Sequence, residues 1–293
     1  MSTALSEDSL WPYFGPLWKD IQSIGQKHVL IAGGYGLFLK QTYLLSNQDV
    51  LVVVPFERWP DTRPRVTKDL DIVLGLDLIV DAEPNKQLSQ TLRNHSFQVS
   101  AENPRWQFER QVLGSQKVIV ELHAELPSDP QQNLKVKDFR VKHKPSLGDH
   151  GIHGRTTPGA VGCELYPFLF EIDGVPVSVP NPVTWSIMKL DAANNHWRKS
   201  NDSNRTEEQR QLNRVQAIKH AKDLCRDVAM STRDEIDTAP MIVDAIRPSP
   251  AYTRAITIFD TLFTDIQLRA TMADGWIEDD FALIQSTLDA WLK

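Results

Sequence analysis

The chain has 293 residues, which is long enough for one large domain or two smaller ones. Hydrophobic residues account for 41% and charged residues for 24% of the sequence, which is typical of a soluble globular protein. The sequence lacks a long uninterrupted apolar segment, which excludes a membrane-spanning helix, and its formal net charge of -6 gives no general attraction to nucleic acid.

The amino terminus and the cysteines indicate the compartment. Residues Met1 to Asp8 are polar and acidic and do not resemble a secretion signal. The two cysteines, Cys163 and Cys225, lack paired metal-ligand spacing, and this favours reduced thiols over a disulfide. These features predict a cytoplasmic protein.

The first part of the chain alternates between helical and strand patterns. Two glycines end the first strand pattern, and prolines mark the loop before the second. The predicted elements are, in chain order, a helix at 10–27, a strand at 28–32, a helix at 37–45, a strand or an insertion at 51–56, a loop at 59–64, a strand from Asp69 and a short helix at 85–94.

The middle of the chain predicts two pairs of strands. The first pair is a hairpin of 105–113 and 117–126, and the second joins 165–172 to 175–179. The segment 145–163 is rich in Gly, Pro and His and predicts a loop between the two pairs. In the strand at 117–126, alternation sets Val118, Val120 and Leu122 on one side and Ile119, Glu121 and His123 on the other.

Pro180-Asn181-Pro182 is the clearest boundary in the sequence. Beyond it the pattern is helical, at 183–197, 207–230, 251–271 and 277–292. The sequence therefore predicts an α+β fold, with a mixed β-sheet domain and flanking helices at 1–180 and a helical domain at 181–293.

Asp69 and Asp71 are the first candidates for chemistry. Side chains at i and i+2 of a strand project from the same face, so both carboxylates point the same way. Like charges held so close repel unless a cation lies between them, and oxygen ligands suit magnesium. Upstream, Gly33 and Gly34 let the backbone approach a phosphate at the start of a helix.

Two stretches are locally basic. One covers 135–144, with Lys135, Lys137, Arg140, Lys142, His143 and Lys144, and the other covers 198–226. A solvated surface is the ordinary interpretation of such a run, and a surface that meets the phosphates of a nucleotide or an RNA is the alternative.

The order of these motifs resembles the nucleotidyltransferase superfamily. A strand that ends in Gly33-Gly34, a helix, and then Arg65-x-Thr67-x-Asp69-x-Asp71 is most similar to the AbiEii/AbiGii toxin family. The similarity continues to a helix that carries Lys189 and to a later helix with Lys222-Asp223, so matching segments run from about Val29 to Val228. The resemblance implies a nucleotidyltransferase-like fold for the first domain.

The resemblance also implies site residues. Asp69 and Asp71 would bind magnesium, with manganese as an alternative, and a third carboxylate would complete the metal site or deprotonate the attacking hydroxyl. Glu121 is the candidate for that role, Glu125 is the alternative, and an exposed strand glutamate is the ordinary interpretation. The nucleotide-binding residues would be Gly33, Gly34, Arg65, Thr67, Lys189 and Asp223.

Some of these assignments remain open. Lys189 would contact the phosphates, although a surface lysine that extends to solvent is the ordinary alternative. If the assignment holds, Lys189→Ala abolishes transfer and leaves the fold intact. Asp227 comes one place later than the family pattern, which leaves its role and that of Lys222 unassigned. His150 and His153 lie in a predicted loop or substrate lid with Asp149, and their spacing does not predict zinc.

The implied function is transfer of an NMP from an NTP to an acceptor. By resemblance the acceptor is the 3′ end of a tRNA or another RNA, and the protein is the toxin of a toxin–antitoxin or phage-defence system with an antitoxin as partner. A small-molecule acceptor or a protein acceptor keeps the same chemistry. A catalytically idle nucleotide-binding protein is a further alternative, and the presence of all the motif residues disfavours it.

Overall fold

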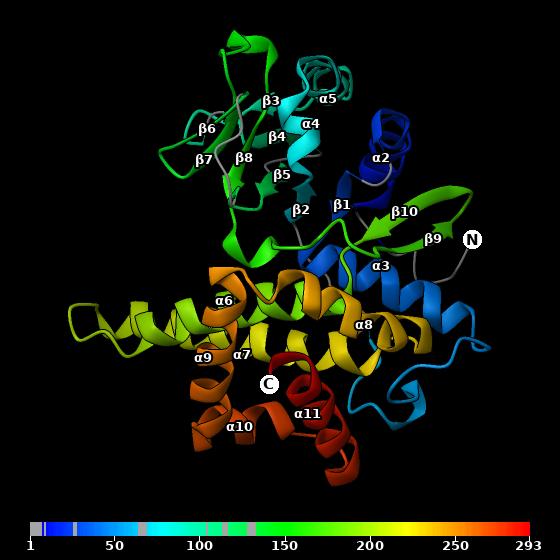
Figure 1. Ribbon diagram of the computed structural model, residues 1–293, viewed down its shortest axis with the longest axis vertical. Helices are drawn as coiled ribbons and strands as arrows, with labels where there is room; N and C mark the ends of the chain where they lie inside the picture. Colours follow the sequence, from blue (N-terminus) through cyan, green and yellow to red (C-terminus); the bar gives the residue numbers. More distant parts are fainter. Residues whose placement is uncertain are drawn as a thin grey trace. The chain divides into compact units, whose positions relative to one another are not determined.

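The structure is a computed structural model that describes residues 8, 10–25, 28–63, 69–103, 105–112, 117–127 and 133–293. The chain forms two compact units (Figure 1). The first comprises Met1–Asn47 and Pro64–Asn181, and the second comprises Gln48–Arg63 and Pro182–Lys293. The fold is mixed α+β, with a mixed sheet and carboxyl-terminal helices, as the sequence predicts. None of the described helices is long and apolar enough to cross a membrane.

The main sheet of the first unit mixes parallel and antiparallel strands. The strand order is β1-β2-β5-β8-β7-β6, β4 also pairs with β5, and β3 pairs with β4. β2 runs parallel to β5, and β5 runs parallel to β8, whereas the other pairs are antiparallel. The strands are β1 (Val29–Ile31), β2 (Asp69–Leu74), β3 (Gln98–Val99), β4 (Gln107–Gln111), β5 (Lys117–Ala124), β6 (Leu134–Lys137), β7 (Arg140–His143) and β8 (His153–Thr156).

One face of this sheet is apolar and buried. In β5 the side chains of Val118, Val120 and Leu122 are at most 2% exposed, while Glu121 and His123 on the alternate face are part-exposed. This alternation confirms the predicted orientation of the strand, because a sheet with one buried face needs apolar residues at every second position. The paired strands β4 and β5 also confirm the predicted hairpin. Its turn at Gly114-Ser115 lies outside the described residues.

Helices and a second hairpin complete the first unit (Figure 1). Aromatic packing joins two of the helices: the rings of Phe14 and Trp18 stack at 5.3 Å, and Phe14 meets Tyr35 edge-on. The indole N–H of Trp18 donates to the carbonyl of Pro176 in the hairpin at 3.0 Å. The elements are α2 (Trp11–Gly25), α3 (Gly33–Ser46), α4 (Leu76–Val80), α5 (Ala82–Asn94), β9 (Phe168–Ile172) and β10 (Val175–Val179).

The strands β6, β7 and β8 differ from the sequence-based expectation. The segment 134–143 forms a hairpin that the prediction did not include, and β8 lies within the predicted loop at 145–163. β8 is only four residues long and contains Gly154, which makes it hard to predict. A Cβ at Gly154 would lie 2.5 Å from the Cβ of Ala124, so only glycine fits where β8 packs at this point.

The second unit is helical after Pro182. Its helices are α6 (Pro182–Ser200), α7 (Glu207–Ala229), α8 (Arg233–Ile246), α9 (Pro250–Thr264), α10 (Ile266–Ala273) and α11 (Glu278–Leu292). The prediction missed α8, which contains Pro240. It also merged α9 and α10, which are separate because the Asp265 side chain accepts from the N–H groups of Gln267 and Leu268 and so starts a new helix.

Residues 48–63 belong to the second unit, although the predicted domain limits include them in the first. The backbone N–H groups of Val53 and Val54 donate to carbonyls of Ser231 and Ala229. Trp59 packs on Trp276 with ring centroids 5.5 Å apart. Residues 51–56 therefore form an insertion held by a short bridge, which is one of the two structures that the sequence left open.

Candidate metal and nucleotide site

The candidate site lies where the polar faces of β2 and β5 meet. These strands are parallel, and Asp71 is directly opposite Glu121 in the register. Cross-strand partners share one face of a sheet, so both carboxylates project from the face opposite the apolar core. Asp69, two residues before Asp71, is on the same face of β2 and is exposed. The pairing thus brings together the three carboxylates that the sequence predicts.

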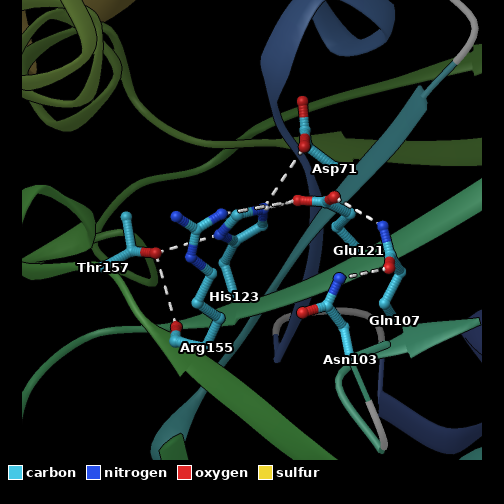
Figure 2. A network of polar contacts seen from close by, with 7 residues as sticks. All are labelled: Asp71, Asn103, Gln107, Glu121, His123, Arg155 and Thr157. Carbon is cyan, nitrogen blue, oxygen red and sulfur yellow. Dashed lines mark hydrogen bonds and ion pairs between the residues drawn. The ribbon is translucent and has the colours of Figure 1, made fainter. Parts of the chain in front are cut away.

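The tightest ligand cluster includes a histidine as well. One ligand atom from each of Asp71, Glu121 and His123 lies within 4.8 Å of the other two. His123 Nε2 is 3.2 Å from Asp71 Oδ1 and 3.8 Å from Glu121 Oε2 (Figure 2). The sequence-based site did not contain His123, although its position two residues after Glu121 on the same strand face was the signal that could have revealed it.

Hydrogen bonds fix the orientation of Glu121. The side-chain amide of Gln107 on β4 donates to Glu121 Oε1 at 2.9 Å, and the Asn103 amide donates to Gln107 at 2.7 Å. The other carboxylate oxygen, Oε2, lies 3.7 Å from the Arg155 guanidinium on β8 (Figure 2). Glu121 is thereby held with Oε2 toward His123 and Arg155, where a ligand can reach it.

Burial and like charge raise the pKa of Glu121. Desolvation is the largest cause, and the negative charges of Asp71 and Asp69 raise it further. The electrostatic interactions of Glu121 with His123 and Arg155 lower this pKa but do not cancel the increase. The site therefore favours a bound positive charge, which would compensate the neighbouring carboxylates.

His123 has a second hydrogen-bond partner that suits a metal ligand. Its Nδ1 lies 2.9 Å from the Thr157 hydroxyl oxygen, which lies 3.4 Å from the Arg155 carbonyl oxygen. If Nδ1–H donates to Thr157 and the hydroxyl donates onward to the carbonyl, Nε2 is left as an acceptor facing Asp71 and Glu121 (Figure 2). Metal-bound histidines usually donate their other ring N–H in this way.

The donor set fits a divalent cation. Two carboxylates suit magnesium or manganese, and an imidazole nitrogen adds affinity for manganese and later transition metals. Asp71, Glu121 and His123 would hold the ion directly, with Asp69 beside them.

The start of helix α3 is packed against Asp71. Gly33 has φ +64°, and a Cβ there would lie 1.8 Å from Asp71 Oδ2, so glycine is required for this contact. Ala32 at the N-cap offers no side-chain acceptor, and the first turn has no acidic residue. The N–H groups that open a helix are available to a phosphate under these conditions. Gly34 follows as a buried helical residue.

Among the described residues, Glu125, His150 and His153 lie outside the ligand cluster. Glu125 Oε2 accepts from the backbone N–H of Gly162 at 3.3 Å, and Glu125 is not part of the cluster around Asp71. Arg65 and Thr67 lie outside the described residues. His153 is buried in β8, and burial together with the charges of nearby cations lowers its pKa to about 4. The ligand cluster among the described residues includes neither His150 nor His153.

Lys189 and Asp223 pair with each other inside the second unit. Lys189 Nζ donates to Asp223 Oδ2 at 2.8 Å, between helices α6 and α7. Lys189 is 4% exposed and Asp223 is 2% exposed. The lysine therefore does not extend to solvent, and its carboxylate partner is Asp223. Asp227, whose role was open, accepts from the Ser186 hydroxyl at 3.2 Å.

No protein-family model, curated protein or solved structure matches this chain.

Proposed function

We propose that the chain is a metal-dependent nucleotidyltransferase with a nucleotidyltransferase-like first unit, and that it transfers an NMP from an NTP to a hydroxyl acceptor. The observation that carries the proposal is the pairing of Asp71 with Glu121 across parallel strands, directly against the glycine that opens α3. This arrangement combines a site for a divalent cation with N–H donors for a phosphate.

The residues have distinct tasks in this reaction. A bound magnesium or manganese ion would neutralise the triphosphate and polarise the α-phosphate. Asp69, Asp71 and Glu121 supply the negative charge that holds the cation, and His123 adds a nitrogen ligand. The acceptor oxygen attacks the α-phosphorus, the bond from that phosphorus to the β-phosphate oxygen breaks, and pyrophosphate leaves. The hydroxyl proton passes to a carboxylate of the site.

The acceptor and the cellular role come from the sequence resemblance. The order Gly33-Gly34, Arg65-x-Thr67-x-Asp69-x-Asp71 and Lys189 resembles that of the AbiEii/AbiGii toxins. On this basis the acceptor is the 3′ end of a tRNA or another RNA, and the protein is a cytoplasmic toxin that an antitoxin restrains.

The test supplies the purified protein with each α-labelled NTP, with magnesium or manganese, and with total tRNA. We expect label at the RNA 3′ end and release of pyrophosphate for at least one NTP. Asp71→Asn should lower the rate about a thousandfold or more, because it removes roughly 4 kcal/mol of transition-state stabilisation. The matched control is Asp173→Asn, an exposed turn residue with φ +50° that asparagine also tolerates, and it should leave the rate unchanged.

The outcomes separate the alternatives. Label in a small molecule or in protein, rather than in RNA, would retain the chemistry and change the acceptor. NTP binding without transfer to any fraction would favour an idle nucleotide-binding protein. If no NTP binds and none is consumed, the proposed function is wrong.

A further inference from the structure

Basic side chains continue the candidate site across the sheet. In the strand register, His123 of β5 pairs with Arg155 of β8, Arg155 pairs with Arg140 of β7, and Arg140 pairs with Lys137 of β6. Because directly paired residues share one face, these four side chains form a row on the face that carries Glu121. Three strand spacings of roughly 4.8 Å make the row about 14 Å long from His123 to β6.

A neighbouring pair widens this row. Lys142 of β7 is opposite Lys135 of β6, and both lie two residues from members of the row, on the same face. On the opposite face, Val141 and Leu134 are buried, at 0% and 8% exposure. The cationic strip consists of Lys135, Lys137, Arg140, Lys142 and Arg155.

The charges of the cationic strip are poorly compensated within the protein. Arg140 lies 3.4 Å from Asp138, and Arg155 lies 3.7 Å from Glu121. Among the described residues, no carboxylate lies within 4.0 Å of the other three cations. Burial lowers the pKa of Lys142, and the charges of its basic neighbours lower it further. A bound polyanion would therefore reduce the repulsion among the cations of the strip.

The other basic stretch, at 198–226, behaves differently. Four of its cations have acidic partners within the second unit, namely Asp202 for Arg205, Glu207 for Arg210, Asp274 for Lys222 and Asp61 for Arg226. Those four pairs fit the ordinary solvated face that a charge run indicates. The strip on β6–β8 differs because the strand register places its cations on the sheet face that carries Glu121.

An exposed aromatic ring indicates which polyanion fits. Phe139 lies in the turn between β6 and β7, has φ +57° and is 84% exposed. Its carbonyl accepts from the Thr156 N–H at 2.9 Å, which anchors the turn to β8. A basic groove or strip with a protruding aromatic ring is typical of proteins that bind single-stranded nucleic acid, since bases stack on the ring.

We propose that the phosphate backbone of a single-stranded RNA lies along the cationic strip, stacks a base on Phe139 and leads its 3′ end to Asp71 and Glu121. The assignment of this RNA as the acceptor rests on the proposed function. The binding surface itself rests on the strand register, the uncompensated charges and the exposed ring.

The test measures binding of a fluorescent single-stranded oligoribonucleotide to the full-length protein by anisotropy, over a range of salt concentrations, with EDTA and without NTP. The oligonucleotide should be longer than the roughly 4–16 nucleotides that such sites cover. Lys135→Ala/Lys137→Ala should lower the slope of log K against log salt by about 1.4, at roughly 0.7 per lost contact. The corresponding loss of affinity at 0.1 M salt is up to about 25-fold.

Two further variants separate charge from stacking. Phe139→Ala should weaken binding about fivefold or more and leave the salt slope unchanged, because it removes a stacking platform and no charge. Lys19→Ala/Lys86→Ala removes the same net charge from exposed positions on α2 and α5, and it should leave the slope as in the wild type.

The outcomes also separate this inference from the proposed function. An unchanged slope in Lys135→Ala/Lys137→Ala overturns the binding surface, even if NMP transfer occurs. Strip-dependent RNA binding without any NMP transfer supports the surface and counts against the enzyme. Equal binding of polyglutamate of the same length, insensitive to Phe139→Ala, overturns the proposal in favour of an acidic protein partner.

Discussion

Charged side chains are arranged differently on the polar face of the sheet and between the helices α6 and α7. On the sheet, Asp71 lies beside Glu121, and the cations on β6, β7 and β8 outnumber the carboxylates near them. Between α6 and α7, a buried lysine has a carboxylate at 2.8 Å. Segregated like charges are relieved by a ligand, whereas a closed ion pair is complete within the protein. Variants on the sheet should therefore change binding, and variants in the helix pair should change stability.

The largest effect should come from breaking the ion pair. Lys189→Ala leaves the carboxylate of Asp223 buried without its lysine, and we expect it to lower the free energy of unfolding by about 3–5 kcal/mol. This differs from the sequence-based expectation that Lys189→Ala leaves the fold intact, which did not include the burial of both groups. Urea unfolding measures the change.

Two controls sharpen this test. Lys189→Met/Asp223→Leu removes both charges and keeps most of the packing, so it should recover most of the lost stability. Arg247→Ala breaks an exposed pair with Asp244, 3.1 Å apart, and should cost less than about 1 kcal/mol. If Lys189→Ala is no more destabilising than Arg247→Ala, the α6–α7 pair does not support the fold and the comparison fails.

A pair of glycine variants tests whether the sheet face is a binding surface. Gly33→Ala and Gly174→Ala both introduce a Cβ at positive φ, and this backbone strain alone should destabilise each variant by about 1 kcal/mol. The new Cβ at Gly33 collides with Asp71, whereas no atom lies within 4 Å of the new Cβ at Gly174. Gly33→Ala should also lower manganese affinity about tenfold or more, as calorimetric titration would show. Equal affinity in both variants would contradict the role of Asp71 as a ligand.

The sequence could predict what depends on local pattern. The alternation in β5 predicted that Glu121 lies on the polar face, and the i, i+2 spacing predicted that Asp69 and Asp71 share a face. The structure confirms both. His123 shares that alternation, but its relevance appears only when parallel pairing with β2 brings Asp71 within 3.2 Å. Such pairing joins residues 52 positions apart and has no local signal.

The elements that the sequence could not predict are short or fixed by distant contacts. β8 is a strand because β5 and β7 pair with it, and its own four residues, with a glycine among them, have little strand propensity. Residues 48–63 join the second unit through backbone bonds to Ala229 and Ser231, nearly two hundred residues away in the chain. Propensity cannot report contacts of that kind.

A smaller effect should separate manganese from magnesium. An imidazole ligand raises affinity for manganese more than for magnesium, which prefers oxygen donors and retains its waters. His123→Gln should therefore lower manganese affinity about tenfold and change magnesium affinity little. Thr157→Val, which removes only the partner of Nδ1, should produce the same selectivity change to a lesser degree. Equal losses for both metals would indicate that His123 orients Asp71 and does not bind the ion.

The smallest effect is the loss, on metal binding, of a pH dependence of stability at Glu121. Burial raises its pKa in the folded protein, so the folded state holds this proton at pH values where the unfolded state, near 4.5, has lost it. In EDTA, stability should then fall as pH rises from about 4.5 through the raised pKa. With manganese bound, the carboxylate is ionised in the folded state, as it is in the unfolded state above about 4.5, so this decline should disappear. Thermal unfolding across this range measures both trends, and Glu121→Gln should remove the decline in EDTA. If stability falls equally in EDTA and in manganese, the metal does not bind through Glu121.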